Sequence, residues 1–290
     1  MVSKETSKEL EALISLLDEP NESIYLTIRE KIFSYGSAAI PPLETAWENS
    51  FNPDIQHRIE EIIHSIQRED LKNDFISWSK EQSHDLLLGY MLVSRFQYPD
   101  LSLEAITKKA GQISQDVWLE LNSNLTGLEK VKVINHILYD IHKFTGSVTN
   151  MTSPENYYIN NLLDTKKGSP LALGLLYIII AQSLKIRIRG VDLPRHFVLA
   201  YLDDQTGRDE SEAGSEVLFY INPFNKGAVF TKNEISLFIN QLKLDPKPGY
   251  YRPCDNPTIL RRLMNELIFI YEQSGNIRKA EDLKELRDLV

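Results

Sequence analysis

One apolar run constrains the fold of this chain more than any other stretch. Residues 171–181 are almost entirely apolar, and no polar face appears before Gln182. Pro170 at the first turn and Ser169 before it predict a helix start, because proline needs no N–H partner there and a serine hydroxyl can cap free amides. A helix that is apolar on every side is buried, so the remaining structure must surround it. This run is too short to span a bilayer.

The composition is that of an ordinary globular protein. The chain has 290 residues, of which 42% are hydrophobic and 25% charged, enough for one large core or several smaller domains. A net charge of -9 argues against non-specific binding of nucleic acid, which needs clustered lysine and arginine. The first residues are polar, unlike a signal segment, and Cys254 is the single cysteine. We therefore expect a cytoplasmic protein without disulfide, metal or cofactor that binds neither membranes nor nucleic acid.

The first eighty residues carry an internal offset. A triplet of isoleucines recurs 31 residues later: Ile24, Ile28 and Ile32 return as Ile55, Ile59 and Ile63. A fixed offset between proline-bearing turns is typical of stacked helix pairs. Residues 1–80 are therefore predicted to form a HEAT-like helical segment, with a helical subdomain of no repeat ancestry as the alternative.

Alternating apolar and charged residues at 186–191, behind the apolar run, predict a strand with one solvated face. Residues 196–202 and 217–221 are predicted to form a second and a third strand. An acidic, glycine-bearing loop is expected at 203–216. Strands joined in this way and laid against a buried helix form an α+β unit with a mostly antiparallel sheet. The predicted fold is thus α+β and predominantly helical, with its core in residues 81–245.

Helical spacing dominates the rest of the chain. Helices are expected at 86–92, 103–111, 131–141, 155–164 and 235–242, with a loop at 144–154. Two further stripes, 260–271 and 280–286, flank a turn at Gly275, so residues 246–290 are predicted to form a TPR-like pair. His136 and His142 lie within one stripe, without the spacing of metal ligands, and are expected to be structural.

The order of these elements points to one class of chemistry. Papain-like and transglutaminase-like enzymes place a cysteine at the N-terminus of a buried helix, where the helix dipole and an imidazolium stabilise the thiolate. A histidine from one strand acts as the base, and an Asp or Asn from the next strand orients it. Here His196 opens one strand and Asn222 follows the next, in that order after the helix. The helix start itself has no cysteine.

The chain resembles the SirB-one type of transglutaminase-like family. The motifs that carry this resemblance are 156–162 (Asn-Tyr-Tyr-Ile-Asn-Asn-Leu), 167–177 (Lys-Gly-Ser-Pro-Leu-Ala-Leu-Gly-Leu-Leu-Tyr), 190–197 (Gly-Val-Asp-Leu-Pro-Arg-His-Phe), 221–227 (Ile-Asn-Pro-Phe-Asn-Lys-Gly) and 259–267 (Ile-Leu-Arg-Arg-Leu-Met-Asn-Glu-Leu). The resemblance spans about residues 85–285 and implies a transglutaminase/papain-like core followed by TPR-like helices. By position, it places Pro170 where an active transglutaminase has its cysteine, and His196 at the base. It places Asn222 where the family commonly has Asp. Loss of the cysteine is common in this family.

No other residue replaces the missing thiol convincingly. Ser169 neighbours the vacant position, but a serine before a proline at a helix start is far more often a cap. Cys254 lies in a linker without any cue for activation. Arg195 is expected to be solvated or to pair with a carboxylate. His196 is equally well a relic that lines a cleft or a structural hydrogen bonder.

These observations lead to three hypotheses. The first is a catalytically degenerate transglutaminase-like protein that binds a protein or peptide partner, since helical repeat-like segments usually present interaction surfaces. The second is an amide- or peptide-directed hydrolase or acyltransferase that uses His196, Asn222 and an unidentified nucleophile. The third is a non-catalytic pocket for a peptide or small molecule.

Overall fold

The computed structural model describes residues 4–147, 152–203 and 217–290. It divides into two compact units, Met1–Ile76 and Ser77–Val290. Nearly all of the acidic loop expected at 203–216 lies outside the described residues. In the part of the chain that the structure describes, no helix combines the length and the hydropathy needed to cross a membrane.

All secondary-structure elements in the described part of the first unit are helices. Its elements are α1 (Lys4–Ile14), α2 (Glu22–Phe33), the 3-10 helix η1 (Gly36–Ala39), α3 (Ile40–Asn49) and α4 (Pro53–Ser77). Each expected stripe forms a helix, and their apolar faces share one core that includes Ile32 and Ile59. The isoleucine triplets do not occupy equal environments, because Ile24 is 48% exposed. Arg58 of α4 binds the connection between α1 and α2, donating to the carbonyl of Leu17 at 2.8 Å.

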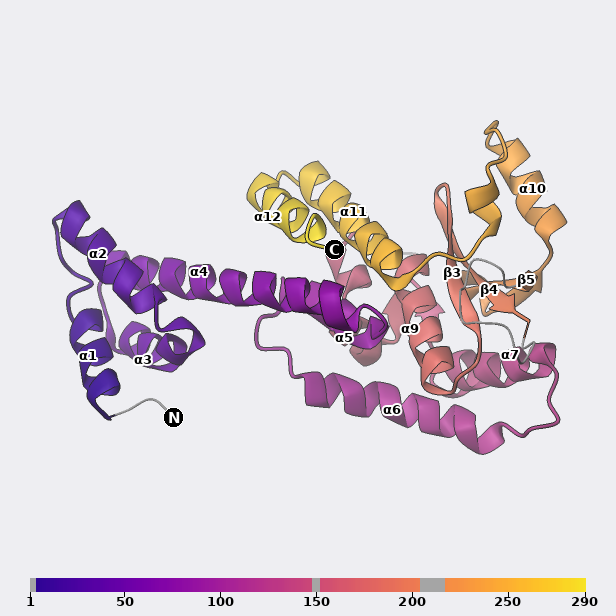
Figure 1. Ribbon diagram of the computed structural model, residues 1–290, viewed down its shortest axis with the longest axis horizontal. Coiled ribbons are helices and arrows are strands. Elements are labelled where there is room, and N and C mark those ends of the chain that lie inside the picture. Colours follow the sequence, from indigo (N-terminus) through magenta and orange to yellow (C-terminus); the bar gives the residue numbers. More distant parts are fainter. Residues whose placement is uncertain (1–3, 148–151, 204–216) are drawn as a thin grey trace. The chain divides into compact units, whose positions relative to one another are not determined.

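The second unit is organised around α9 (Pro170–Ser183). Every residue from 171 to 181 is buried, as the sequence predicts. The helix lies between strands on one side and the helices α5 (Leu86–Arg95) and α6 (Leu103–Glu120) on the other (Figure 1). The sheet is antiparallel, in the order β3 (Ile188–Leu193), β4 (His196–Leu202), β5 (Val217–Asn222) and β6 (Ala228–Phe230). The fold is therefore α+β and predominantly helical, as predicted.

Strand β4 is buried on both faces. Side chains alternate along a strand, so Val198, Ala200 and Leu202 share one face, where they pack with α10 (Lys232–Gln241). The opposite face begins with Phe197, which packs against α9 at a glycine. A Cβ on Gly174 of α9 would lie 2.6 Å from the Phe197 ring, and a Cβ on Gly190 of β3 would lie equally close to it. Only glycine allows helix, ring and neighbouring strand to approach this closely.

Short elements account for most differences from the predicted pattern. The stripe expected at 131–141 is α7 (Gly127–Asn135) continued by a π-helical turn, η3 (His136–Ile141). The helix expected at 155–164 is a 3-10 turn, η4 (Pro154–Tyr157), followed by α8 (Ile159–Thr165). The loop expected at 144–154 contributes β1 (Thr145–Gly146), which pairs in parallel with β2 (Lys167–Gly168). Two-residue strands carry no alternation, and β6 is nearly as short, so periodicity cannot find them.

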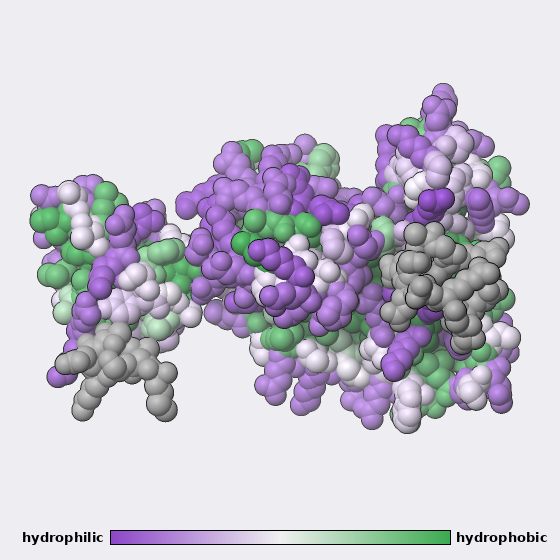
Figure 2. All heavy atoms as spheres, viewed as in Figure 1, coloured by the Kyte–Doolittle hydropathy of each residue, from purple (hydrophilic) through white to green (hydrophobic). Residues whose placement is uncertain are grey.

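The C-terminal helices form an antiparallel hairpin. It consists of α11 (Asn256–Gln273) and α12 (Ile277–Arg287), joined at Gly275 with φ +77°. Positive φ is accessible to glycine without strain, which explains the turn predicted there. One face of α11 is buried, whereas the visible surface of the hairpin is mostly hydrophilic (Figure 2).

Six basic residues of the described chain have a left-handed backbone. They are Lys143, Lys166, Lys185, Arg195, Lys226 and Lys243, with φ between 47° and 62°. Each of the five lysines stands just after a helix or 3-10 turn, where its charge complements the partial negative charge of the helix end. Arg195 is different, since it lies in the turn between β3 and β4.

Candidate functional site

The start of α9 is held by Ser169. Its hydroxyl accepts a hydrogen bond from the Ala172 amide at 3.1 Å, and its own amide donates to the carbonyl of Asn156 at 2.9 Å. The Ser169 side chain is buried, and Pro170 occupies the first helical position. Ser169 is thus the N-cap, as predicted, and its hydroxyl is engaged by the backbone.

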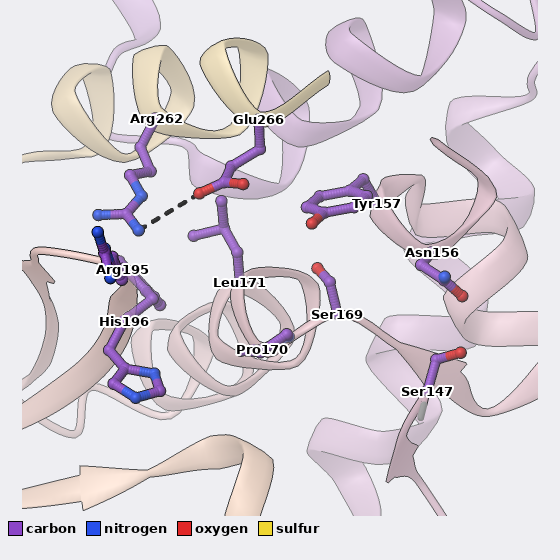
Figure 3. Close-up of a pocket in the computed structure, with 11 residues that line it drawn as sticks. Ser147, Asn156, Tyr157, Ser169, Pro170, Leu171, Arg195, His196, Arg262 and Glu266 are labelled. Carbon is purple, nitrogen blue, oxygen red and sulfur yellow. Dashed lines mark hydrogen bonds and ion pairs between the residues drawn. The ribbon is translucent and has the colours of Figure 1, made fainter. Parts of the chain in front are cut away.

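A pocket of about 160 Å³ opens beside this helix start (Figure 3). It is lined by Ser147, Asn156, Tyr157, Ser169, Pro170, Leu171, Arg195, His196, Phe197, Arg262 and Glu266. These residues come from the end of β1, η4, the start of α9, the β3–β4 turn, β4 and α11, which are far apart in the sequence. The pocket therefore exists only in the folded second unit.

The β3–β4 turn forms one wall of the pocket and is anchored to α11. Leu193 pairs with His196, which leaves Pro194 and Arg195 as a two-residue turn. Arg262 donates through Nη1 to the Leu193 carbonyl at 2.9 Å and forms an ion pair with Asp192. A single arginine thus fixes the tip of the hairpin.

Arg262 also lies within a compensated group of charges. Its Nη2 reaches the Glu266 carboxylate one helical turn away, at 3.3 Å. The Arg262 side chain is 17% exposed, and its charge is shared between Glu266 and Asp192. Burial of the guanidinium is therefore balanced by two carboxylates and one carbonyl.

His196 lines the pocket, but its ring lies against α10. The imidazole centroid is 4.6 Å from that of Phe238. By strand alternation, His196 shares the β4 face of Val198, the face that packs against α10. Figure 3 shows the imidazole and the Ser169 hydroxyl pointing in different directions. Partial burial, assisted by the nearby Arg262 charge, lowers the pKa of His196 below its ordinary value of 6.5, so the ring is neutral at pH 7.

Asn222 serves the turn that follows β5. Its Oδ1 accepts hydrogen bonds from the amides of Phe224 and Asn225, each at 3.1 Å. The described residues contain no hydrogen bond between Asn222 and His196, and Asn222 does not line the pocket. The structure therefore places these two predicted partners on neighbouring strands without joining them.

The turn after Asn222 is anchored by the helices before it. The Tyr139 hydroxyl donates to the Pro223 carbonyl at 2.8 Å, and Asn135 Nδ2 donates to the Gly227 carbonyl at 2.9 Å. Asn135 in turn accepts from the Tyr177 hydroxyl of α9 at 3.0 Å. This buried network orders the turn without any catalytic partner.

The remaining thiol and histidines take structural roles. The Cys254 thiol donates to the Gly190 carbonyl at 3.2 Å, burial raises its pKa to about 12, and it does not line the pocket. His136 pairs with Asp140, and His142 pairs with Asp116. In the three described ranges, no group of three or more His, Cys, Asp or Glu side chains could hold a metal ion.

Comparison with known protein families shows where this chain belongs. The sequence model of the Transglutaminase-like superfamily matches residues 104–265, more than half of the chain. The chain belongs to this superfamily. The match covers the capped helix α9, His196, Asn222 and Arg262, so this transglutaminase-like protein keeps the helix and strands that would carry a catalytic site.

Two kinds of relative are similar to this transglutaminase-like protein. F-box only protein 21 of Mus musculus is 26% identical over 185 residues, which are 64% of this chain and 28% of that protein. The UPF0162 protein of Xylella fastidiosa strain 9a5c is 22% identical over 211 residues, 69% of each chain. The chain thus spans little more than a quarter of F-box only protein 21. No solved structure matches it.

Sequence reasoning found the helix start and the β3–β4 turn but not the whole pocket. Arg262 and Glu266 lie in one of the motifs of the resemblance, and their spacing of four places them on one helix face. That spacing could have indicated their ion pair, but not that it borders the pocket. Ser147 has no sequence signal at all.

Proposed function

We propose that this chain is a catalytically degenerate transglutaminase-like protein that binds a protein or peptide partner at the pocket beside α9. The observation that carries the proposal is the state of the helix start. Pro170 has no nucleophilic atom, and the neighbouring Ser169 hydroxyl is engaged as the cap of α9. A pocket is nevertheless open there.

The geometry of the other two positions supports the same function. The His196 ring packs on Phe238, and the Asn222 side chain is occupied by backbone amides. A nucleophile, base and orienting group must lie within hydrogen-bond reach of each other to act together. A pocket that is accessible but has no such chain of contacts is suited to binding.

We further propose that the chain is of the SirB-one type within the superfamily, and that its C-terminal hairpin is TPR-like. The order of the five motifs and the antiparallel pair α11–α12 support this assignment. The name F-box only protein 21 describes a protein with an F-box, and similarity to it adds weight to a role in protein interaction.

An activity assay tests the catalytic half of the proposal. Wild-type protein, His196→Ala and Pro170→Cys are incubated with a glutamine-containing peptide and a primary amine, and ammonia release is measured. We expect wild type and His196→Ala to be indistinguishable from buffer. Turnover by the wild type that disappears in a folded His196→Ala variant would overturn the proposal. Pro170→Cys reports whether a thiol alone restores chemistry.

Site-specific photo-crosslinking in the native cell tests the binding half. A photo-reactive residue is placed at His196, at the pocket, and in a second variant at Lys185, an exposed position at the other end of α9, roughly 20 Å away. We expect a discrete protein adduct from position 196 and not from 185. Equal adducts from both positions, or none from 196, would contradict binding at the pocket.

A further inference from the structure

We propose that Arg195 makes this pocket a receptor for a carboxylate supplied by the bound partner. The carboxylate belongs either to the C-terminus of a peptide or to an Asp or Glu side chain. This inference rests on the proposed function, because it names the chemistry by which the same pocket recognises a partner.

The charges that line the pocket single out Arg195. Arg262, the other lining arginine, is neutralised by Asp192 and Glu266. Glu266 is the lining carboxylate, and it is held by Arg262. Within the described residues, Arg195 has neither an ion pair nor a hydrogen bond from its side chain. Its exposed guanidinium is therefore available to a ligand, and its planar fork matches a carboxylate.

Other polar groups that line the pocket suit an anion. Burial raises the pKa of Tyr157 to about 12, so its hydroxyl remains a neutral donor, and Figure 3 shows it directed toward Ser169. The positive end of the α9 dipole faces the same space, since the pocket is lined by Ser169, Pro170 and Leu171. Tyr157, the start of α9 and Arg195 thus line one pocket, with Leu171 between Arg195 and the Tyr157 hydroxyl (Figure 3).

The backbone of Arg195 supports the assignment independently. Five of the six left-handed basic residues follow helix ends, where a cation is stabilised. Arg195 has no helix end to explain it, and glycine or asparagine is the usual choice at such a position. Pro194 restricts the turn, and Arg262 holds the carbonyl of Leu193 just before it, so the backbone that carries the Arg195 side chain is fixed. Such preorganisation reduces the entropy lost when a ligand binds.

The size of the pocket limits the ligand. A cavity of about 160 Å³ accommodates one side chain or one terminal residue, since a cavity of about 150 Å³ can hold a benzene molecule. The ligand is therefore a single carboxylate-bearing residue inserted from a partner, with the rest of the partner outside.

An NMR titration of the full chain tests the inference with three small probes. N-acetylglutamate amide carries a side-chain carboxylate, N-acetylglutamine amide is its neutral isostere, and N-acetylalanine carries a terminal carboxylate. We expect at least one carboxylate probe to shift the amide signals of the β3–β4 turn and of the first turn of α9. We expect the neutral isostere to bind at least about tenfold more weakly. The tighter of the two carboxylate probes identifies the source of the group.

Matched variants assign the interaction to Arg195. Arg195→Gln should weaken the better carboxylate probe by about tenfold or more. Lys185→Gln should leave it unchanged, because Lys185 is a basic residue with the same left-handed backbone at the far end of α9. Equal binding of the acid and its isostere, no binding of either carboxylate, or an unchanged affinity in Arg195→Gln would overturn the inference.

Failure of this inference differs from failure of the proposed function. A pocket-specific crosslink from position 196 without carboxylate binding removes the role of Arg195 and leaves the binding function in place. Turnover that depends on His196 removes the proposed function, whatever the probes do.

Discussion

The two faces of β4 differ in what holds them. On the α9 face, Phe197 fits against Gly174 and Gly190 so closely that neither position has room for a methyl group. On the α10 face, the first side chain is His196, an exposed residue that rests on the partly buried Phe238. The first face therefore fixes the position of the helix on the sheet, whereas the second face receives the residue that would carry chemistry.

This difference separates architecture from activity. A buried helix with its start beside two strands is the arrangement that papain-like catalysis requires, and here close packing of Phe197 on Gly174 helps to maintain it. This packing does not depend on a nucleophile, because Phe197, Gly174 and Gly190 are in contact whatever residue stands at position 170. Four experiments can break or sharpen this comparison.

The largest effect is expected at the α9 face. Gly174→Val places two methyl groups into the Phe197 ring and should lower the free energy of unfolding by about 3 kcal/mol in urea denaturation. Gly111, in an open position on α6, is the matched control: Gly111→Ala should raise stability by about 0.5–1 kcal/mol. If the two variants had the same free energy of unfolding, the close contact between Phe197 and Gly174 would not be important for stability.

Removal of the helix cap should have the next largest effect. Ser169→Ala deletes the acceptor for the Ala172 amide and should cost about 1 kcal/mol. Ser102 caps α6 through the amide of Ala105, so Ser102→Ala should cost a similar amount. A loss several times larger at Ser169 than at Ser102 would show that the hydroxyl does more than cap.

In the turn before β4, a substitution should raise the free energy of unfolding instead of lowering it. Arg195→Gly relieves a left-handed arginine and is expected to raise the free energy of unfolding by about 0.5 kcal/mol. Carboxylate binding should be lost in the same variant. A clear loss of stability, measured by urea denaturation, would mean that the guanidinium has a structural partner and is not reserved for a ligand.

The smallest effect is a pH dependence from the α10 face. Because the pKa of His196 is lowered in the folded protein, the unfolded chain binds a proton more readily below pH 6.5. His196 therefore contributes stability above that pH, and the contribution is lost as the pH falls. Between pH 7.5 and 5.5, His196→Gln should lose less stability than wild type in parallel urea titrations. A steeper loss in the variant would contradict the packing of a neutral ring on Phe238.

The parts of the fold that could be predicted from the sequence are those encoded by neighbouring residues. The run at 171–181 and the cap at Ser169 are local, so helix, burial and start are all predictable. The turn at Gly275 is equally local. The prediction at 196–202 matches β4, and that at 217–221 ends one residue short of β5. The first strand was expected two residues early, at 186–191 against Ile188–Leu193, because pairing across the sheet decides where a strand begins and ends.

The site is harder to predict, because it depends on which way each side chain points from its strand or helix. The order of Pro170, His196 and Asn222 along the sequence is that of the catalytic positions in an active transglutaminase. No local pattern in the sequence, however, shows which face of β4 packs against which helix. In the folded unit, the Phe197 face lies against Gly174 of α9. The contribution of Arg262 depends on a contact with Asp192 across 70 residues, which no local pattern encodes.

The contact between Arg262 and Asp192 also has a consequence for biosynthesis. A ribosome that adds about 5–20 residues per second finishes the β3–β4 hairpin several seconds before it reaches α11. During that interval the hairpin tip lacks its anchor, and the wall formed by α11 does not exist. The pocket therefore acquires its shape only after α11 has been synthesised, and a chain truncated before Arg262 would contain α9 and β4 but lack the α11 wall of the pocket.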